Sequence, residues 1–432
     1  MTKKKLLESF ETVLAVVGIA FYAGAFGFAP DDAAPILPKI ILTLLRYSIW
    51  VTSTIFLLVR WRGALKTVKR DLILCLYIFI LFFSFIWADE KRWIFSINLR
   101  DVLQVATFGL YFATSFSLRD QVRIIAISFG IQALGSVFVA SIRPSIGVHT
   151  SGPHIGSWKG LYVQKNYFSS LMIVGLISFF SLSMESLKSR FYKWLGVFLF
   201  VTLIILSRSG TGFFILSFTT LLILLLQKLP RKVEIRIVSL SLGILALFSI
   251  IFLLAANWVQ LVDMLGKDAT LTGRIPLWTY CLNQLQNQDK FLLGFGSGQF
   301  FLPGTKTWVG AYYSSVGFFA PHPHNGYINI LLDVGLLGFA LLAITFIIAL
   351  IRSMILTIYV TKYSLELLWP ISFLIFMLLN NISETQTGGI FLILYMSIAF
   401  SVAKRTPVII SDSLGGLSPH RQQRENITSA KN

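Results

Sequence analysis

The sequence predicts an all-α polytopic membrane protein, with about twelve transmembrane helices and one large outer loop that contains short amphipathic helices. Charged residues make up 13% of the 432 residues, whereas soluble globular proteins carry about 25%. Hydrophobic residues make up 55%, and the mean hydropathy is +0.75. Windows such as 12–29 and 71–88 are almost entirely apolar, and about 18 such residues cross a hydrocarbon core of ~30 Å. A membrane β-barrel would instead require alternating segments of ~10 residues.

Twelve hydrophobic stretches are predicted to span the membrane. They lie near residues 11–29, 36–59, 71–88, 100–118, 122–142, 167–186, 191–206, 211–227, 236–257, 325–351, 366–380 and 387–403. With the N-terminus inside, the cytoplasmic segments hold 24 of the 37 lysines and arginines, and the outer segments hold 11. This distribution follows the positive-inside rule and places both termini in the cytoplasm. The other two, Lys39 and Arg46, fall inside the second span.

The chain is predicted to form one membrane domain, residues 1–403, and a polar cytoplasmic tail, residues 404–432, that is expected to be disordered. No cleavable signal peptide is evident, so "MTKKK" is expected to lead into a start-transfer helix. The net charge of +18 lies largely in loops that set membrane orientation, so nucleic-acid binding is not expected. The two cysteines imply no disulfide framework. Two long outer segments, 143–166 and 258–324, stand out because long loops are often functional.

Two arginines on the outer side are candidates for binding an anion. Arg208 lies in "SRSGTGF", between the seventh and eighth spans. It is either an anchor at the membrane boundary or part of an anion site, since "SGTG" can expose backbone N–H groups at a helix start. Arg274 lies in "LTGRIPLW" and is either a solvated loop arginine or an anion contact beside a helix N-terminus. The expected helix has an apolar stripe at helical spacing, formed by Ile275, Trp278, Leu282 and Leu285.

Two further outer segments carry polar or glycine residues in unusual settings. "QKNYFSS" places Lys165 and Asn166 directly before the sixth span. The lysine is either a binding residue or an interfacial anchor beside Tyr162 and Tyr167. "LLGFGSGQF", residues 292–300, does not follow a parallel strand and so is not a nucleotide-binding fingerprint. It is expected to be a tight-turning loop that lets a substrate approach the backbone.

"PHPHNGY" holds two of the five histidines at the start of the tenth span. His322 and His324 suggest a metal site, but no Cys, Asp or Glu stands at ligand spacing, so a third ligand is missing. A general base fits better, because histidine titrates near neutral pH. Asn325 follows the candidate base directly. With nearby arginines, this pattern suits a lipid-linked phosphate or pyrophosphate and a hydroxyl that attacks the carbon bearing it.

The stretch "HNGYINILLDVGLLGF" resembles the signature of the O-antigen ligase and polysaccharide polymerase superfamily. The matching positions are His324, Asn325 and, after nine residues, Gly335 and Gly338. "SRSGTGF" and "LTGRIPLW" resemble the two arginine motifs of the family, and "QKNYFSS" resembles its Lys-Asn motif. The resemblance covers residues 160–340, with one departure: Asp333 stands where many members carry glutamate.

This resemblance implies a metal-independent glycosyltransferase of the bacterial inner membrane, without a cofactor and with its active site facing the periplasm. Its donor would be an undecaprenyl-pyrophosphate-linked glycan, and its acceptor a hydroxyl on lipid A-core or on a growing glycan. Carried over, His324 would be the base and Arg208 and Arg274 would contact the pyrophosphate. Lys165, Asn166 and Asn325 would complete the substrate-binding residues.

Two questions stay open at the sequence level. The motifs do not separate ligase, polymerase and protein glycosylation, although no added protein-binding domain is evident. The alternative is a transporter of a small anion or of a lipid-linked glycan, for which charges inside a span, such as Lys39 and Arg46, give slight support.

Overall fold

A computed structural model describes residues 3–26, 37–184, 186–228, 232–256, 273–303, 305, 321–358 and 364–415. All regular elements within these residues are helical, and one isolated β-bridge joins Val148 to Trp158. The fold is therefore all-α, as the sequence predicts. Each of the twelve predicted spans overlaps a helix in the described residues.

The helices divide into long members of a bundle and short pieces at its ends. The long helices are α1 (Lys3–Tyr22), α2 (Lys39–Val59), α4 (Leu72–Phe83), α6 (Gln104–Ser115), α7 (Leu118–Ile142), α9 (Lys165–Phe180), α10 (Leu187–Leu206), α11 (Gly210–Gln227), α12 (Val233–Ala256), α16 (Gly326–Ile358), α17 (Trp369–Ser383) and α18 (Gly389–Gly415). The helices outside the bundle are α3 (Trp61–Val68), α5 (Lys91–Asn98), α8 (Pro144–Gly147) and α14 (Arg274–Asn287). Single turns lie at Ser84–Ile86, Leu99–Leu103, Gly152–His154 and Leu365–Leu368.

Seven helices among the described residues are long and apolar enough to cross a membrane, by length and composition. They lie at Lys39–Val59, Leu118–Ile142, Leu187–Leu206, Gly210–Gln227, Gly326–Ile358, Leu365–Ser383 and Gly389–Pro407. Two shorter apolar helices lie at Leu72–Ile86 and Lys165–Phe180. The protein is therefore a polytopic membrane protein, and the number twelve stays a prediction.

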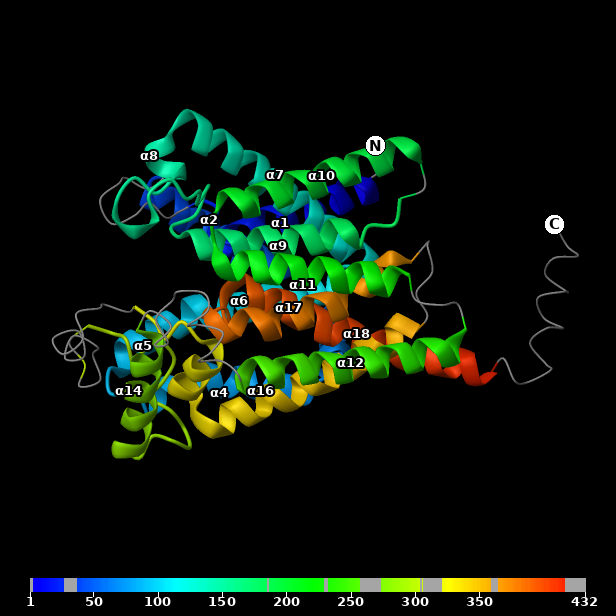
Figure 1. Ribbon diagram of the computed structural model, residues 1–432. Helices are drawn as coiled ribbons and strands as arrows, with labels where there is room; N and C mark the ends of the chain where they lie inside the picture. Colours follow the sequence, from blue (N-terminus) through cyan, green and yellow to red (C-terminus); the bar gives the residue numbers. More distant parts are fainter. Residues whose placement is uncertain are drawn as a thin grey trace, which may run out of the picture.

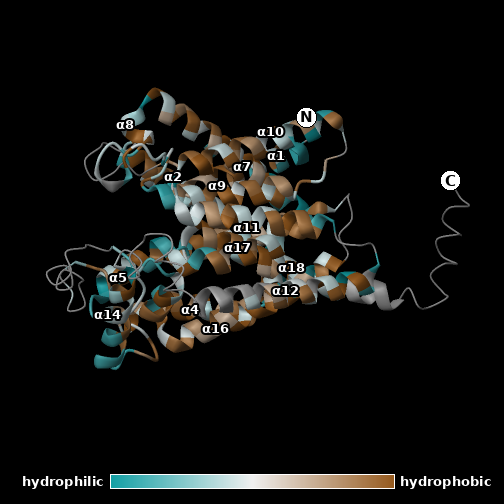
Figure 2. Cartoon of the chain, viewed as in Figure 1, coloured by the Kyte–Doolittle hydropathy of each residue, from teal (hydrophilic) through white to brown (hydrophobic). Residues whose placement is uncertain are grey.

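Burial separates central from peripheral helices. In the most apolar windows of α17 and α18, 78% and 83% of residues are buried, compared with 11% in α2. The outer faces of the peripheral helices carry exposed aliphatic side chains such as Ile40, Leu44 and Leu58. Figure 2 shows apolar colour along the bundle and hydrophilic colour mainly towards its ends. These faces suit contact with lipid, because helices satisfy their backbone polar groups internally.

The bundle has two distinct ends. The start of α1 and the C-terminal part of α18 lie at one end, whereas α5, α8 and α14 lie at the other (Figure 1). Helices α9, α11 and α16 begin at the end that carries α14. Of the charges predicted inside the second span, Lys39 is the first residue of α2 and is exposed, and the Arg46 guanidinium lies 5.7 Å from the centre of the Phe21 ring. Lys39 thus lies at a helix start, and Arg46 packs on an aromatic ring.

Parts of the predicted domain organisation fall outside the described residues. Of the loop 258–324, residues 258–272, 304 and 306–320 are outside, and so are residues 416–432 of the tail. Helix α18 continues to Gly415, so residues 404–415, which were expected to be disordered, are helical.

Candidate active site

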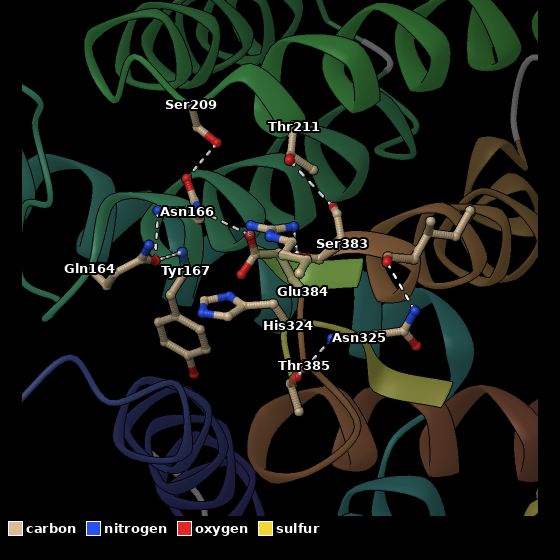
Figure 3. A network of polar contacts seen from close by, with 12 residues as sticks. Gln164, Asn166, Tyr167, Ser209, Thr211, His324, Asn325, Ser383, Glu384 and Thr385 are labelled. Carbon is tan, nitrogen blue, oxygen red and sulfur yellow. Dashed lines mark hydrogen bonds and ion pairs between the residues drawn. The ribbon is translucent and has the colours of Figure 1, made fainter. Parts of the chain in front are cut away.

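The candidate active site is centred on Glu384, which follows α17 directly. Asn166 Nδ2, at the start of α9, donates to Glu384 Oε1 at 2.9 Å. Arg274 Nη2, at the start of α14, lies 3.7 Å from the same oxygen, and Arg274 Nη1 donates to the carbonyl of Ser383 at 2.6 Å. Figure 3 shows Asn166 and Glu384 reaching toward each other from two different elements. One carboxylate therefore joins two predicted site residues that lie far apart in the sequence.

The Lys-Asn motif and the first arginine motif are hydrogen-bonded to each other. Ser209 Oγ donates to Asn166 Oδ1 at 2.9 Å, and Lys165 Nζ donates to the carbonyl of Arg208 at 3.0 Å. Both polar atoms of the Asn166 side chain therefore bind protein groups. The hydrogen bonds of Asn166 thus link the start of α9 to Ser209 and Glu384 (Figure 3).

The helices that meet here begin with side-chain caps. Gln164 Oε1 accepts from two backbone N–H groups of α9, and Ser209 Oγ accepts from the N–H of Gly212 in α11. Asn325 Oδ1 accepts from Tyr327 N at 3.0 Å and Ile328 N at 3.1 Å in α16. Such caps satisfy the unpaired N–H groups of a first turn. Because the positive ends of α9, α11 and α16 point at this region, it attracts negative charge.

Asn325 has a second contact that fixes the backbone beside His324. Its Nδ2 donates to the carbonyl of Ile382 at 3.2 Å, and its backbone N–H donates to Thr385 Oγ1 at 3.2 Å. The side-chain oxygen and nitrogen of Asn325 are thus both hydrogen-bonded to backbone groups of the protein. The residue positions His324 against the segment that carries Glu384.

His324 has an unusual backbone and an unpartnered ring nitrogen. Its φ is 51°, in the left-handed region that non-glycine residues rarely adopt. Its backbone N–H donates to His322 Nδ1 at 3.3 Å, and the two ring centres lie 4.1 Å apart. His324 Nδ1 is buried and has no hydrogen-bond partner in the described part of the chain. Strained backbones of this kind concentrate at functional sites.

Burial and charge set the protonation of the site. Burial, His322 and Arg274 together lower the pKa of His324 to about 3, and burial and Arg274 lower that of His322 to about 4. Both imidazoles are therefore neutral at pH 7, and a neutral imidazole has one nitrogen that accepts a proton. Burial raises the pKa of Glu384 to about 7, against the opposing effects of Arg274 and the Asn166 hydrogen bond. Glu384 thus exchanges a proton near neutral pH.

The two arginines occupy different parts of the site. Arg274 lies beside Glu384, and its charge lowers the pKa of His324. The guanidinium of Arg208 packs on Gly156, where an added Cβ would lie 3.1 Å from Arg208 Nη1. Arg208 also has a left-handed backbone, with φ 49°. The chain of contacts from Lys165 and Asn166 connects the two arginines.

Helix α14 exists where the sequence predicts it and begins at Arg274, but the predicted apolar stripe is only partly its buried face. The structure buries Leu277, Cys281 and Leu285 against the glycine-rich loop and α16. Ile275 and Leu282 of the predicted stripe remain 39% and 38% exposed. The helix is apolar on two sides, and its packing partners select one of them. Trp278 Nε1 donates to the carbonyl of Pro323 at 2.7 Å, which ties α14 to the residue before His324.

The glycine-rich loop packs on the helix α16 instead of exposing all its backbone to a substrate. Helix α16 breaks at Gly335, which has φ 63° and ψ −166°. Residues 291–296 hydrogen-bond to the broken turn, for example Phe295 N to Leu332 O at 2.7 Å. Asp333 Oδ1 accepts from Gly298 N at 2.8 Å, and Oδ2 accepts from Asn329 Nδ2 at 2.8 Å. Gly335 and Asp333 thus hold the loop in place.

Sequence reasoning missed Glu384. It lies in "NNISETQTGG", a short polar segment between two apolar helices, in a chain with 19 acidic residues. The scarcity of acidic residues was the available signal. An acidic side chain beside a membrane span costs free energy, and such residues are often functional. Which basic residue it faces depends on packing between α9, α14 and α17.

No curated protein matches the chain. Residues 195–343 match a protein-family model described as O-Antigen ligase. The matched segment contains Arg208, Arg274, His324 and the glycines of the broken turn, but not Lys165, Asn166 or Glu384. The match supports the resemblance to the O-antigen ligase family that the motifs carry.

Proposed function

We propose that the protein transfers a glycan from an undecaprenyl-pyrophosphate-linked donor to an acceptor hydroxyl on the periplasmic side of a bacterial inner membrane. The observation that carries the proposal is that Arg274 and the backbone next to His324 both bind the segment 382–385, where several capped helices begin. A base and an anion site lie together there. Ligase and polymerase chemistry share this arrangement, so the acceptor is lipid A-core or a growing glycan.

The reaction follows from these groups. The acceptor hydroxyl gives its proton to His324, and its oxygen attacks the sugar carbon bound to the pyrophosphate. The bond from that carbon to the phosphate oxygen breaks, and the electron pair leaves with the pyrophosphate. Arg274, Arg208 and the helix N-termini stabilise the charge that develops on this leaving group.

The low pKa of His324 in the free protein is compatible with a role as base, because the bound donor is expected to raise it. Burial and the positive charge of Arg274 depress it, and a pyrophosphate bound at Arg274 would oppose both effects. An anion within ~4–6 Å raises the pKa of a histidine. Donor binding is therefore expected to move His324 towards the pKa range in which a base is effective.

Glu384 competes with the donor for Arg274. In its ionised form it pairs with the guanidinium that the pyrophosphate needs. In its protonated form it is neutral, and Arg274 is available. The other ionisable groups near it are Arg274, which pairs with it, and His324, whose pKa of about 3 keeps it neutral above pH 5.

Donor binding is therefore expected to depend on pH. Because the pKa of Glu384 is raised to about 7, the donor KM should fall as the pH is lowered from about 8 to about 6. The change should approach tenfold per pH unit at most. In Glu384→Gln, which keeps an oxygen for Asn166, the donor KM should be low and nearly independent of pH. The same pH dependence in this variant would show that another group is responsible.

The function is tested by transfer in vitro with a defined undecaprenyl-pyrophosphate glycan and a purified acceptor. The purified protein in proteoliposomes should form the glycosylated acceptor, also in EDTA, because the reaction described needs no metal. Arg274→Gln should raise the donor KM by about 10- to 100-fold, the size expected for charged hydrogen bonds. Lys290→Gln, which removes a positive charge just after α14, is the matched control and should leave the donor KM unchanged. Donor flux across the membrane without any transfer product would support a transporter instead.

The proposed orientation places both termini in the cytoplasm and the site in the periplasm. It is supported by the basic residues at the end of the bundle opposite α14, such as Arg62, Lys66 and Lys69 in and beside α3. The start of α1 and the C-terminal part of α18 lie at that same end (Figure 1).

A further inference from the structure

Four buried polar side chains lie beside the candidate site, and the proposed reaction does not use them. They are Ser170 on α9, Asn380 and Asn381 in the last turn of α17, and Gln386 just after α17. Their exposed fractions are 3%, 1%, 4% and 4% in that order. Amides and hydroxyls buried to this extent cost free energy unless they are hydrogen-bonded. The four residues are referred to below as the amide network.

The members of the amide network are hydrogen-bonded to one another. Ser170 Oγ donates to Asn380 Oδ1 at 2.9 Å, and Asn380 Nδ2 donates to Gln386 Oε1 at 2.6 Å. The backbone N–H of Gln386 donates to Asn381 Oδ1 at 3.0 Å. Both polar atoms of the Asn380 side chain are thus bonded. These contacts fold the chain that follows α17 back onto the helix and join it to α9.

The turn held by the amide network is the one that makes the contacts of the site. Residues 382–385 accept hydrogen bonds from Arg274, Asn166 and, at two positions, Asn325 (Figure 3). Four consecutive residues therefore place both the guanidinium of Arg274 and the backbone next to His324.

The start of α16 also packs on the amide network. A Cβ added to Gly326 would lie 2.1 Å from Asn381 Oδ1. The backbone of α16 thus approaches Asn381 at a distance that leaves no room for a Cβ unless the asparagine side chain moves. Gly326 is two residues after His324, so a displaced Asn381 would let the start of α16 and the proposed base shift together.

Side-chain hydrogen bonds are important in this turn because the helix ends there. Helix α17 ends at Ser383, and the chain is not helical again until α18 begins at Gly389. Connections between helices are normally more mobile than the helices, whereas a buried and fully bonded polar network makes a segment rigid. A reacting group displaced by ~1 Å can lower a rate about 10²-fold. The rigidity of this connection therefore bears on the rate of transfer.

We propose that Ser170 and Asn380 are positioning residues, which hold the turn after α17 so that His324 is aligned with a donor bound at Arg274. They touch no reacting atom and act through residues 382–385. This alignment rests on the proposed function, whereas the rigidity of the turn does not. Rigidity and transfer are therefore measured separately.

Hydrogen–deuterium exchange of the backbone amides, followed by mass spectrometry, measures the rigidity. The full chain in nanodiscs is compared with Ser170→Ala, which removes the hydroxyl donor of Asn380 Oδ1. Exchange in the peptides that contain Gln386 and Asn325 should become about tenfold or more faster, since a buried acceptor is left unpaired. Unchanged exchange in either peptide would overturn the proposal.

Two further variants separate positioning from stability. Ser178→Ala is the matched control, because Ser178 is fully buried on the same helix but donates to a carbonyl within α9. It should exchange as the wild type does. Asn380→Leu with Gln386→Met removes a bonded pair together, and such paired apolar replacements are nearly neutral for stability. The hydroxyl of Ser170 keeps a partner in this double variant, because it also lies 3.0 Å from the carbonyl of Asn166. The double variant should keep the melting temperature of the wild type and still exchange faster in both peptides.

Transfer kinetics measure the alignment. In the assay above, Ser170→Ala should lower kcat by about 10- to 100-fold and change the donor KM little, because Arg274 and the helix N-termini still bind the pyrophosphate. In a His324→Asn background the same substitution should have no further effect, since no base is left to align. An unchanged kcat in Ser170→Ala, or a full second loss in that background, would overturn the positioning role. Absence of transfer by the wild type would defeat the proposed function instead, and the exchange experiment would still decide whether the amide network holds the turn.

Discussion

The variant His324→Asn is expected to lower glycan transfer by about 10²- to 10⁴-fold, the range that a positioned general base contributes. Asparagine is the informative replacement because His324 has φ 51°, and asparagine tolerates the left-handed region better than alanine. The loss should therefore reflect missing proton transfer and not backbone strain. It should appear in kcat, with little change in the donor KM. The measurement is steady-state transfer with the defined donor and acceptor.

His322→Asn is the matched control, because its ring accepts the backbone N–H of His324 but is not proposed to touch substrate. We expect a smaller loss, within about tenfold, since a neutral hydrogen bond contributes about 1 kcal/mol. Normal transfer by His324→Asn would remove the proposed base. An equal loss in both variants would indicate that the pair acts as a structural unit.

The variant Gly335→Ala is expected to cause the largest loss of folded protein. Gly335 has φ 63° at the break in α16, and an added Cβ would lie 2.3 Å from the carbonyl oxygen of Leu292. The left-handed backbone alone costs about 1–2 kcal/mol, and the backbone contact cannot be relieved by a side-chain rotation. The loop 291–296 would have to leave α16. The purified yield and the melting temperature in detergent should both fall sharply.

Gly298→Ala separates the cost of backbone strain from the cost of a steric clash with the added Cβ. Gly298 also has a positive φ, 74°, but nothing lies within 4 Å of an added Cβ. It should therefore show only the cost of the backbone conformation, about 1 kcal/mol. If the two variants were equally stable, the packing of the loop against α16 would not be what requires glycine.

The positions of the long helices were predictable because the membrane imposes a simple rule on each segment separately. A stretch near the length of the hydrocarbon core needs apolar side chains wherever it lies in the bundle. Hence α9 and α17, which are central, and α2, which is peripheral, were located equally well. The order of burial was not predictable, since all three helices are apolar on most faces.

The site was predictable only for residues whose local pattern is unusual. His324 and Arg274 stand out in an apolar chain, and the helix beginning at Arg274 was expected. Glu384 was missed, because its partners Arg274 and Asn166 reach it through tertiary packing. The buried face of α14 was only partly predicted for the same reason: Phe295, Phe300 and Ile328, not the helix, decide which stripe is covered.

The pairing of the glycine-rich loop with the broken turn of α16 bears on how such proteins can be recombined. Backbone bonds join Phe295 to Leu332 and Leu336 to Phe291, and Trp278 binds the carbonyl of Pro323. Residues 273–303 and 321–338 thus form one transplantable unit that carries both Arg274 and His324. Exchanging either segment alone between homologues would replace one side of these contacts, whereas exchanging both together would keep the contacts between the two segments. The contacts of Arg274 with Ser383 and Glu384 would still depend on the segment that follows α17.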